Sequence, residues 1–270
     1  MQGPERQDRE DLTLLVEAAR AAGEIALRYW QNDPKAWEKS EGAGPVTEAD
    51  LEIDKMLARD LQAARPSYGW LSEESQDDPA RLAAKRGFII DPIDGTRAFM
   101  DGSGDFSHAL AVVEDGLVRA AVVYLPAVGR LYAAARDGGA LCNETPLRIS
   151  GHAEEAGARI LTTKVNFEPR YWPHGAPPVS RHFRSSLAYR LALVGEGRYD
   201  GMLTFRPTWE WDSAAGSLIA AEAGAKVCDR EGQDLRFNRP DPRSAGVFAG
   251  SRALVDKFMA RLSGQTGLTA

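Results

Sequence analysis

The chain has little cysteine, no long apolar run and no surplus of basic residues. Its 270 residues include only two cysteines, Cys142 and Cys228, which excludes a disulfide framework and a cysteine-based zinc motif. We interpret both as small buried residues. No apolar stretch approaches the roughly 18 residues of a transmembrane helix. The polar first ten residues lack the apolar segment of a signal peptide, so we expect a cytoplasmic protein.

The charge balance limits the kinds of partner that this chain is expected to bind. Acidic residues outnumber basic ones by 39 to 33, which gives a net charge of -6. This balance argues against a nucleic-acid-binding surface and against a polybasic membrane surface, so neither partner is expected. A negative chain should also repel anionic small molecules, which is a tension that the site residues must resolve.

Apolar periodicity predicts two halves that follow a short tail. We expect residues 1–11 to be a disordered tail and residues 12–150 to form an α+β half, with helices from Leu12 to about Asn32 and from Thr47 to Arg65. Strands are predicted at 68–71, 87–90, 107–113, 117–124 and 130–135. Residues 151–270 alternate strands (159–163, 202–205, 226–229) with helices (186–195, 213–223, 252–262), which indicates an α/β half.

The segment around Asp91 carries the strongest chemical signal. The apolar run Phe88-Ile89-Ile90 ends abruptly in Asp91-Pro92-Ile93-Asp94-Gly95-Thr96. A buried carboxylate is costly unless it is paired or bound to a metal, so two acids at a strand end suggest a shared Mg²⁺ ion. The alternative is a plain turn, because Asp, Pro and Gly are all turn residues.

Two further acidic strings have the same ambiguity when each is taken alone. Asp212 stands directly before the small-residue run Ser213-Ala214-Ala215-Gly216, where it could be a helix N-cap. Glu73 and Glu74 follow a short apolar strand in Leu71-Ser72-Glu73-Glu74-Ser75, where they could lie in a solvated loop. Together, the three strings resemble the inositol monophosphatase superfamily of Mg²⁺-dependent, lithium-sensitive phosphatases. Gly44–Asp50 and Gly139–Asn143 add support, and the resemblance covers roughly residues 12 to 262.

The resemblance implies a layered α/β/α/β/α sandwich and a set of metal ligands. Glu73, Asp91 and the backbone carbonyl of Ile93 would hold a first Mg²⁺, and Asp91, Asp94 and Asp212 a second. A third, weaker ion would also use Glu73, with Asp50 as a candidate ligand nearby, although Asp50 also fits as an ordinary residue of its helix. The resemblance therefore implies two to three Mg²⁺ ions, for which Mn²⁺ can substitute because it accepts the same oxygen ligands.

The resemblance also implies catalytic and substrate-binding roles. Glu73 and Thr96 would orient the attacking water, with Asp94 as a third catalytic residue. The backbone N–H groups of Gly95 and Thr96 would hold the phosphate, because a helix start attracts anions. The implied substrate contacts are Gly95, Thr96, Arg97, Arg184, Ser185 and Asp212. Arg184 could equally be a solvated helix end.

The substrate stays open among the inositol monophosphatases, histidinol phosphatases, fructose-1,6-bisphosphatases and 3'(2'),5'-bisphosphate nucleotidases. Leu71–Glu74, Gly104–Ser107 and Pro207-Thr208 are most similar to the nucleotidases, and Arg97 would suit a second phosphate. Phe205 stands where the inositol enzymes usually carry a sugar-binding glutamate, and it is either a stacking residue or a core residue.

We therefore expect an enzyme that converts 3'-phosphoadenosine 5'-phosphate to AMP and phosphate, with inositol-1-monophosphatase or histidinol-phosphatase as alternatives. A non-catalytic relative that binds a metal or a nucleotide is a remote option. The partner is a small phosphorylated metabolite, and a homodimer is possible. Two or three Mg²⁺ ions would bring about +4 to +6 of local charge, so net charge does not exclude a phosphate ester.

Overall fold

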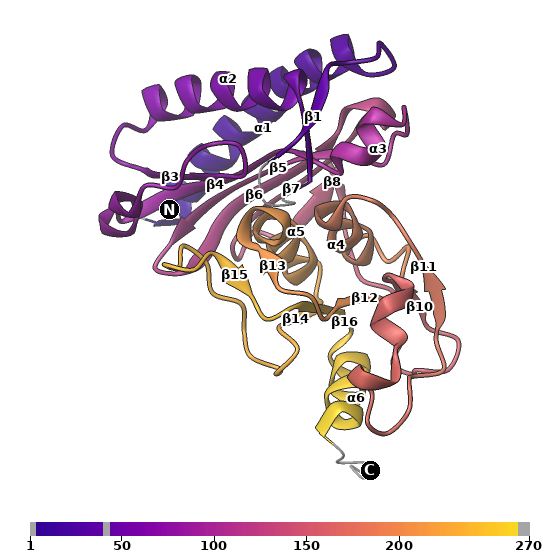
Figure 1. Ribbon diagram of the computed structural model, residues 1–270. Coiled ribbons are helices and arrows are strands. Elements are labelled where there is room, and N and C mark those ends of the chain that lie inside the picture. Colours follow the sequence, from indigo (N-terminus) through magenta and orange to yellow (C-terminus); the bar gives the residue numbers. More distant parts are fainter. Residues whose placement is uncertain (1–3, 40–43, 264–270) are drawn as a thin grey trace.

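The computed structural model describes residues 4–39 and 44–263 (Figure 1). Its larger sheet has seven strands in the order β3 (Gly69–Ser72), β4 (Arg86–Asp94), β5 (Ser107–Glu114), β6 (Leu117–Leu125), β7 (Arg130–Ala135), β8 (Ala140–Cys142) and β9 (Thr145–Pro146). Only β3 and β4 pair in parallel, and the other neighbours in this sheet are antiparallel.

The smaller sheet has five strands in the order β11 (Ser180–His182), β10 (Arg159–Leu161), β12 (Gly201–Thr204), β16 (Val247–Gly250) and β14 (Lys226–Cys228). Two short antiparallel pairs complete the strands: β1 (Ala36–Glu38) with β2 (Pro45–Thr47), and β13 (Thr208–Trp209) with β15 (Arg243–Ser244).

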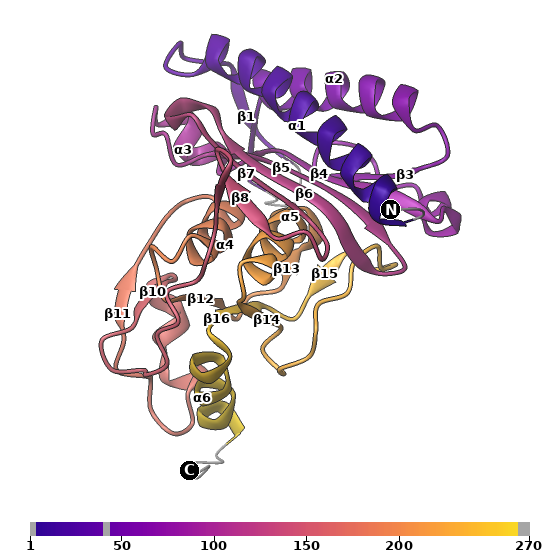
Figure 2. The same cartoon turned by 180° about the vertical axis from the view of Figure 1, so that it is seen from behind.

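Helices separate and cover the two sheets in five layers (Figures 1 and 2). Helices α1 (Pro4–Tyr29) and α2 (Glu48–Ala64) lie on the outer face of the larger sheet, and α4 (Leu187–Gly195) and α5 (Glu210–Glu222) lie between the sheets. Helix α6 (Arg252–Ser263) covers the far side of the smaller sheet. The α/β/α/β/α sandwich expected from the sequence is therefore confirmed. A short helix, α3 (Thr96–Met100), and 3-10 turns at 79–83, 126–128, 164–167 and 169–171 connect these elements.

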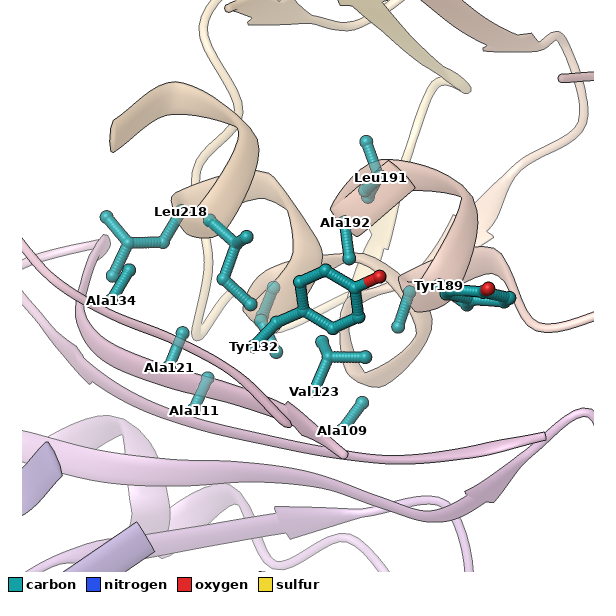
Figure 3. Packing of buried hydrophobic residues seen from close by; sticks show 14 of the residues in the cluster. Ala109, Ala111, Ala121, Val123, Tyr132, Ala134, Tyr189, Leu191, Ala192 and Leu218 are labelled. Carbon is teal, nitrogen blue, oxygen red and sulfur yellow. The ribbon is translucent and has the colours of Figure 1, made fainter. Parts of the chain in front are cut away.

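Alternation along the central strands explains how the larger sheet is buried on both faces. In β5, Ala109 and Ala111 pack toward α4 and α5, whereas Leu110 and Val112 pack toward α1 and α2. Figure 3 shows the inner face, where small strand residues leave room for side chains from the two middle helices. Side chains of adjacent strand residues point to opposite faces, so one strand serves both cores.

The two middle helices approach each other closely at Gly216, in the middle of α5. A Cβ atom on Gly216 would lie 2.7 Å from the Cβ of Leu191 and 2.9 Å from the carbonyl oxygen of Ala188. Only glycine fits so short a separation, as the run Ala214-Ala215-Gly216 had indicated. This contact holds the first turn of α5, which bears Asp212, against α4.

The N-terminal prediction was wrong for residues 4–11, because α1 begins at Pro4 and includes most of the expected tail. Asp8 and Asp11 are 1% and 0% exposed, and both pair with Arg86 of β4, at 3.0 and 2.8 Å. Arg119 of β6 also pairs with Asp8, at 2.6 Å. These ion pairs join distant parts of the chain, so no local periodicity reveals them. Residues 1–3 lie outside the described part.

Most other elements lie close to their predicted bounds. Thr47 caps α2 and forms a capping box with Asp50, as expected, and Cys142 and Cys228 are both buried and free. Helix α1 ends at Tyr29, slightly earlier than predicted, and the short strands β1, β2, β8, β9, β11, β13, β15 and β16 were missed. The division at residue 150 stays a prediction: the two sheets fall on either side of it, yet α4 and α5 pack against both. Within the described ranges no helix has the length and apolarity to cross a membrane.

We expect Asp11→Ala to lower the free energy of unfolding by about 3–5 kcal/mol, because it leaves the buried Arg86 guanidinium with one carboxylate fewer. Glu10→Ala is the matched control on the same helix: its partner Arg6 is 75% exposed, so the change should stay within about 0.5 kcal/mol. Urea unfolding measures both. Equal effects would show that the α1 ion pairs do not stabilise the fold.

Candidate active site

Asp91 and Asp94 lie at the carboxyl end of strand β4, which continues past the predicted end at Ile90. The pairing with β5 shifts register between them, from Asp91 opposite Ala109 to Asp94 opposite Ser107. Asp91 is 1% exposed, and its Oδ1 atom is buried without a hydrogen-bond partner among the described residues. An unpartnered buried carboxylate oxygen is rare and calls for a ligand.

Contacts from α4 hold Asp94. Its Oδ2 atom accepts a hydrogen bond from the Ser186 hydroxyl at 2.6 Å and another from the backbone N–H of Ala188 at 2.7 Å. Gly95 follows with φ of +97°, and a Cβ there would lie 3.1 Å from the carbonyl oxygen of Asp105. Glycine is therefore required for the turn from β4 into α3.

Glu73 sits on a loop that α2 supports. Asp54 of α2 accepts hydrogen bonds from the hydroxyls of Ser72 and Ser75, at 2.6 and 2.7 Å, on either side of the Glu-Glu pair. The backbone N–H of Glu73 donates to the carbonyl of Ile90 at 3.2 Å, which places the loop beside β4. The loop is thus anchored at both ends, so Glu73 does not lie in a freely solvated loop.

Lys39 lies between the two glutamates. Its Nζ atom is 2.8 Å from Oε1 of Glu73 and 2.6 Å from Oε1 of Glu74. Burial lowers the pKa of Lys39, but the two carboxylates outweigh it and raise that pKa above its usual value. Burial raises the pKa of Glu74 to about 7. The ammonium group supplies positive charge where the resemblance places a metal.

Asp212 lies inside the first turn of α5 and is not its N-cap, which is Trp209. The N-cap interpretation was therefore wrong: the helix begins two residues before Asp212, and this leaves its carboxylate free to face β4 rather than the helix end. Arg206 is its near neighbour, with Nη2 3.4 Å from Oδ2.

These carboxylates act on one another. Burial raises the pKa of Asp91 well above its usual value, and the negative charges of Glu73, Asp94 and Asp212 raise it further. The pKa of Asp212 is raised well above its usual value in the same way, by burial and then by Asp94 and Glu73. Four acids from three distant segments therefore share one low-dielectric region, as the three sequence strings predict.

The donor set suits a hard cation, although its side chains are not closed around one point. Within the described ranges, no three acidic, histidine or cysteine side chains stand in an arrangement that could hold a metal ion as they are. The chemistry nevertheless fits Mg²⁺, because the ligands are all oxygens and Asp91 has an unpaired Oδ1. Thr96 lies beside the carbonyl of Ile93 and donates to it at 3.2 Å.

Asp50 has a structural role that the sequence anticipated. It is 1% exposed and accepts hydrogen bonds from the backbone N–H and the hydroxyl of Thr47 in the capping box. Burial raises its pKa to about 6, and the charge of Glu73 adds to the rise. Asp50 is therefore an electrostatic neighbour of Glu73, and its role as a third-metal ligand stays a prediction.

The predicted substrate contacts divide into two groups. Gly95, Thr96 and Asp212 lie with the acids, whereas Arg97 is exposed on α3. The Arg184 guanidinium lies 3.7 Å from Asp105. The carbonyl of Ser185 accepts a hydrogen bond from Arg190 at 3.2 Å. Substrate binding by Arg97, Arg184 and Ser185 stays a prediction.

Phe205 is a core residue. It is 4% exposed, stacks on Tyr171 at 4.5 Å between ring centroids and meets Trp172 and Phe248 edge-on. Of the two roles that the sequence leaves open, the core role is the one that these contacts support.

Three contributors were missed by sequence reasoning in these roles: Lys39, His108 and Ser186. Ser186 stands directly before a predicted helix, and its N-cap position was the one local signal available. His108 is buried under the ligand turn, with Nδ1 hydrogen-bonded to the Pro92 carbonyl, and burial lowers its pKa to about 4, so it donates as a neutral ring. Lys39 reaches Glu73 and Glu74 only through tertiary packing.

A hollow of about 440 Å³ opens beside Glu73 and is lined by Ser72, Glu73, Ser75, Asp77, Trp209, Trp211, Pro240, Asp241 and Pro242. Two larger hollows, of about 640 and 570 Å³, lie elsewhere and include none of the clustered acids. Residue chemistry therefore identifies the site, and of these three hollows the one beside Glu73 borders the clustered acids.

A comparison with known proteins gives the family. The model of the inositol monophosphatase family matches residues 7–266. The chain belongs to this family. The inositol-1-monophosphatase of Rhizobium meliloti is 33% identical over 232 residues, which cover 82% of this chain and 86% of that protein.

Other relatives of this inositol monophosphatase family member carry different names. The 3'(2'),5'-bisphosphate nucleotidase CysQ of Salmonella typhimurium is 29% identical, over 90% of this chain and 99% of that protein. The histidinol-phosphatase of Chlorobaculum parvum is 31% identical, over 83% of this chain and 87% of that protein. Among solved structures, an IMPase from Thermotoga maritima has a TM-score of 0.80 and 28% sequence identity. The match covers 95% of this chain and 97% of that one. The family is generally Mg²⁺-dependent, and these names do not single out one substrate.

We expect Asp91→Asn to stabilise the metal-free protein, because it removes a buried charge that its neighbours repel. A gain of about 1–2 kcal/mol corresponds to a melting temperature about 3–6 °C higher for a chain of this size. The rise in melting temperature that Mg²⁺ produces in the unaltered protein should disappear. Differential scanning fluorimetry with and without Mg²⁺ measures both.

Asp101→Asn is the matched control, because Asp101 is an exposed aspartate at the end of α3. It should leave both temperatures unchanged. A lower melting temperature for metal-free Asp91→Asn would contradict the proposed repulsion, and an unchanged Mg²⁺ response would exclude Asp91 as a ligand.

Proposed function

We propose that this family member is a Mg²⁺-dependent phosphomonoesterase that hydrolyses 3'-phosphoadenosine 5'-phosphate to AMP and phosphate. The observation that supports the phosphatase chemistry is the buried, unpartnered Oδ1 of Asp91, a carboxylate that the negative charges of Glu73, Asp94 and Asp212 also affect. Hydrolysis adds water across the ester P–O bond, which releases the alcohol and inorganic phosphate.

The metal ions would be held by Glu73, Asp91, the Ile93 carbonyl, Asp94 and Asp212. When bound, they would lower the pKa of a water and neutralise the oxygens of the transferred phosphoryl group. Contacts around these ligands keep them in place: Ser186 and Ala188 hold Asp94, and Asp54 holds the loop of Glu73. Side chains that are held before the ligand arrives need little rearrangement in the reaction.

Glu73 and Thr96 would orient the attacking water. Thr96 already directs its hydroxyl proton to the Ile93 carbonyl, which leaves the oxygen lone pairs of the hydroxyl available to a water. The backbone N–H groups of Gly95 and Thr96 would receive the phosphate at the turn into α3. A positioned water is sufficient as the nucleophile, so we propose no phosphoenzyme.

The choice of a nucleotide substrate depends on what stands at the substrate end of the site. The resemblance places a sugar-binding glutamate of the inositol enzymes at Phe205, and here that side chain is stacked in the core. A polyol therefore lacks its carboxylate acceptor. Two observations support the nucleotidase branch. The first is the pair of strings Leu71–Glu74 and Pro207-Thr208, and the second is the CysQ relative, 99% of whose length is covered by the match to this chain.

Inositol-1-monophosphatase is the second candidate, because the Rhizobium meliloti relative is 33% identical. Histidinol-phosphatase is a third, on the strength of the Chlorobaculum parvum relative. Both share the metal-binding chemistry, so only the substrate can separate them.

A substrate panel tests the proposal. Purified enzyme with Mg²⁺ is given equal concentrations of adenosine 3',5'-bisphosphate, inositol 1-phosphate and histidinol phosphate, and released phosphate is measured. We expect the highest kcat/KM for the bisphosphate, inhibition by lithium, and a loss of about 10²-fold or more in Asp94→Asn. Equal or better turnover of inositol 1-phosphate would refute the nucleotidase assignment, and undiminished hydrolysis by Asp94→Asn would refute its metal role.

A further inference from the structure

His108 is a polar side chain at a core position of β5. It is 0% exposed, and the next residues on the same face of the strand, Leu110 and Val112, belong to the apolar core under α1 and α2. Its ring lies 6.3 Å from that of Phe106 and 6.2 Å from that of Tyr124, between centroids. Within the described residues its Nε2 atom is buried without a hydrogen-bond partner. An apolar side chain would avoid this cost, so an imidazole at this position needs an explanation.

The strand opposite His108 carries a β-bulge. Pro92 and Ile93 of β4 both stand opposite this one residue, because the pairing of β4 with β5 shifts register between Asp91 and Asp94. A bulge bends its strand and re-aims the groups beside it, and bulges are frequent next to active sites. This bulge separates two of the proposed metal ligands, and its second residue carries a third, the Ile93 carbonyl.

The imidazole fixes the first residue of the bulge. Nδ1 of His108 is hydrogen-bonded to the carbonyl of Pro92. Burial lowers the pKa of His108 to about 4, so the ring is neutral at neutral pH, and its one proton must lie on Nδ1 to be donated to a carbonyl. Proline has no N–H, so its carbonyl is the only backbone group through which Pro92 can be hydrogen-bonded. The following carbonyl, that of Ile93, accepts instead from Thr96 at 3.2 Å.

The preceding residue of β5 acts on the other face of the sheet. The hydroxyl oxygen of Ser107 is 3.0 Å from that of Ser186, which in turn donates to Asp94. Successive residues of a strand point to opposite faces. Strand β5 therefore supports the acid-bearing end of β4 from both sides, through Ser107 on the side of α4 and through His108 on the side of α1 and α2.

We propose that His108 is a positioning residue of the metal site, which holds the Pro92 carbonyl and so sets the direction of the Ile93 carbonyl toward the ion. The inference rests on the proposed metal-dependent function and adds to it a residue that touches neither the metal nor the substrate. Asp91 and Asp94 flank the same bulge, so their carboxylates depend on the same hydrogen bond. Loss of a group that orients a metal ligand typically weakens metal binding by about 10- to 100-fold.

Leucine and asparagine make a matched pair of substitutions at this position. Both side chains branch at Cγ, as the imidazole does, but only the asparagine amide has a donor where Nδ1 stands. We expect His108→Leu to raise the Kd for Mg²⁺ by about tenfold or more, and His108→Asn to restore most of the affinity. Calorimetric titration of Mg²⁺ into the substrate-free protein measures both values, and circular dichroism shows whether each variant folds.

Val112→Ala is the control that separates metal positioning from packing. Val112 is fully buried on the same face of β5, farther from the bulge and opposite Phe88 of β4. Removing its methyl groups should lower the melting temperature, because a cavity is left in the core, and should leave the Kd for Mg²⁺ unchanged.

The metal-free protein provides a second readout. Nitrogen chemical shifts from NMR of protein labelled with ¹⁵N-histidine distinguish the two neutral tautomers and the charged ring. The signal that is missing from His108→Asn identifies His108 among the four histidines of the chain. We expect a neutral ring protonated on Nδ1, and a charged ring or a proton on Nε2 would overturn the proposal.

The outcomes separate this role from the proposed function. An unchanged Mg²⁺ affinity in His108→Leu, equal losses in the leucine and asparagine variants, or an equal loss in Val112→Ala would each refute the positioning role. If the three substrates of the panel are not hydrolysed while Mg²⁺ binds the unaltered protein and binds His108→Leu more weakly, the phosphatase function fails and the role of His108 stands. If the unaltered protein does not bind Mg²⁺, both proposals fail.

Discussion

The burial of Asp91 among other carboxylates is the constraint on which the rest of the site depends. A carboxylate that is 1% exposed, with an oxygen that nothing in the described chain satisfies, destabilises the metal-free fold. The surrounding layers keep it there. Strand β4 is covered on one face by α1 and α2 and on the other by α4 and α5, so its end cannot move toward solvent without disturbing both cores.

The same layers supply the supports of the other acids, which explains why residues so far apart in the sequence act together. Helix α2 holds the Glu73 loop through Asp54, α4 holds Asp94 through Ser186, and α5 carries Asp212 against α4 at the Gly216 contact. Each acid is thus tied to a different layer of the sandwich. The site is assembled by the packing of the sandwich, not by any one segment.

Some features arise within one segment and others only from the packing of several segments, and only the first kind could be predicted from the sequence. The layer order, α2 with its Thr47 cap and the acids of the three strings follow from local patterns, because periodicity and turn residues act over a few positions. The α1 start was missed because Asp8 is held by Arg86 and Arg119, over a hundred residues away in the case of Arg119. Lys39 was missed for the same reason: its contacts with Glu73 and Glu74, more than thirty residues away, exist only after folding.

The clustered acids and the arginines near them stand on different kinds of segment. The acids that we propose as metal ligands stand on β4, on α5 and on a loop clamped to α2. Arg206 stands in the connection between β12 and β13, and the partners of Arg190 are carbonyls of the segment before α4. Connecting segments can change without disturbing a core, and regular elements cannot. Relatives that carry the names of different phosphatases belong to the same family, so the family framework by itself does not determine the substrate. The acidic surplus of the chain therefore says little about its substrate, because the field at a site is set by the charges near it and not by the balance over all 39 acids.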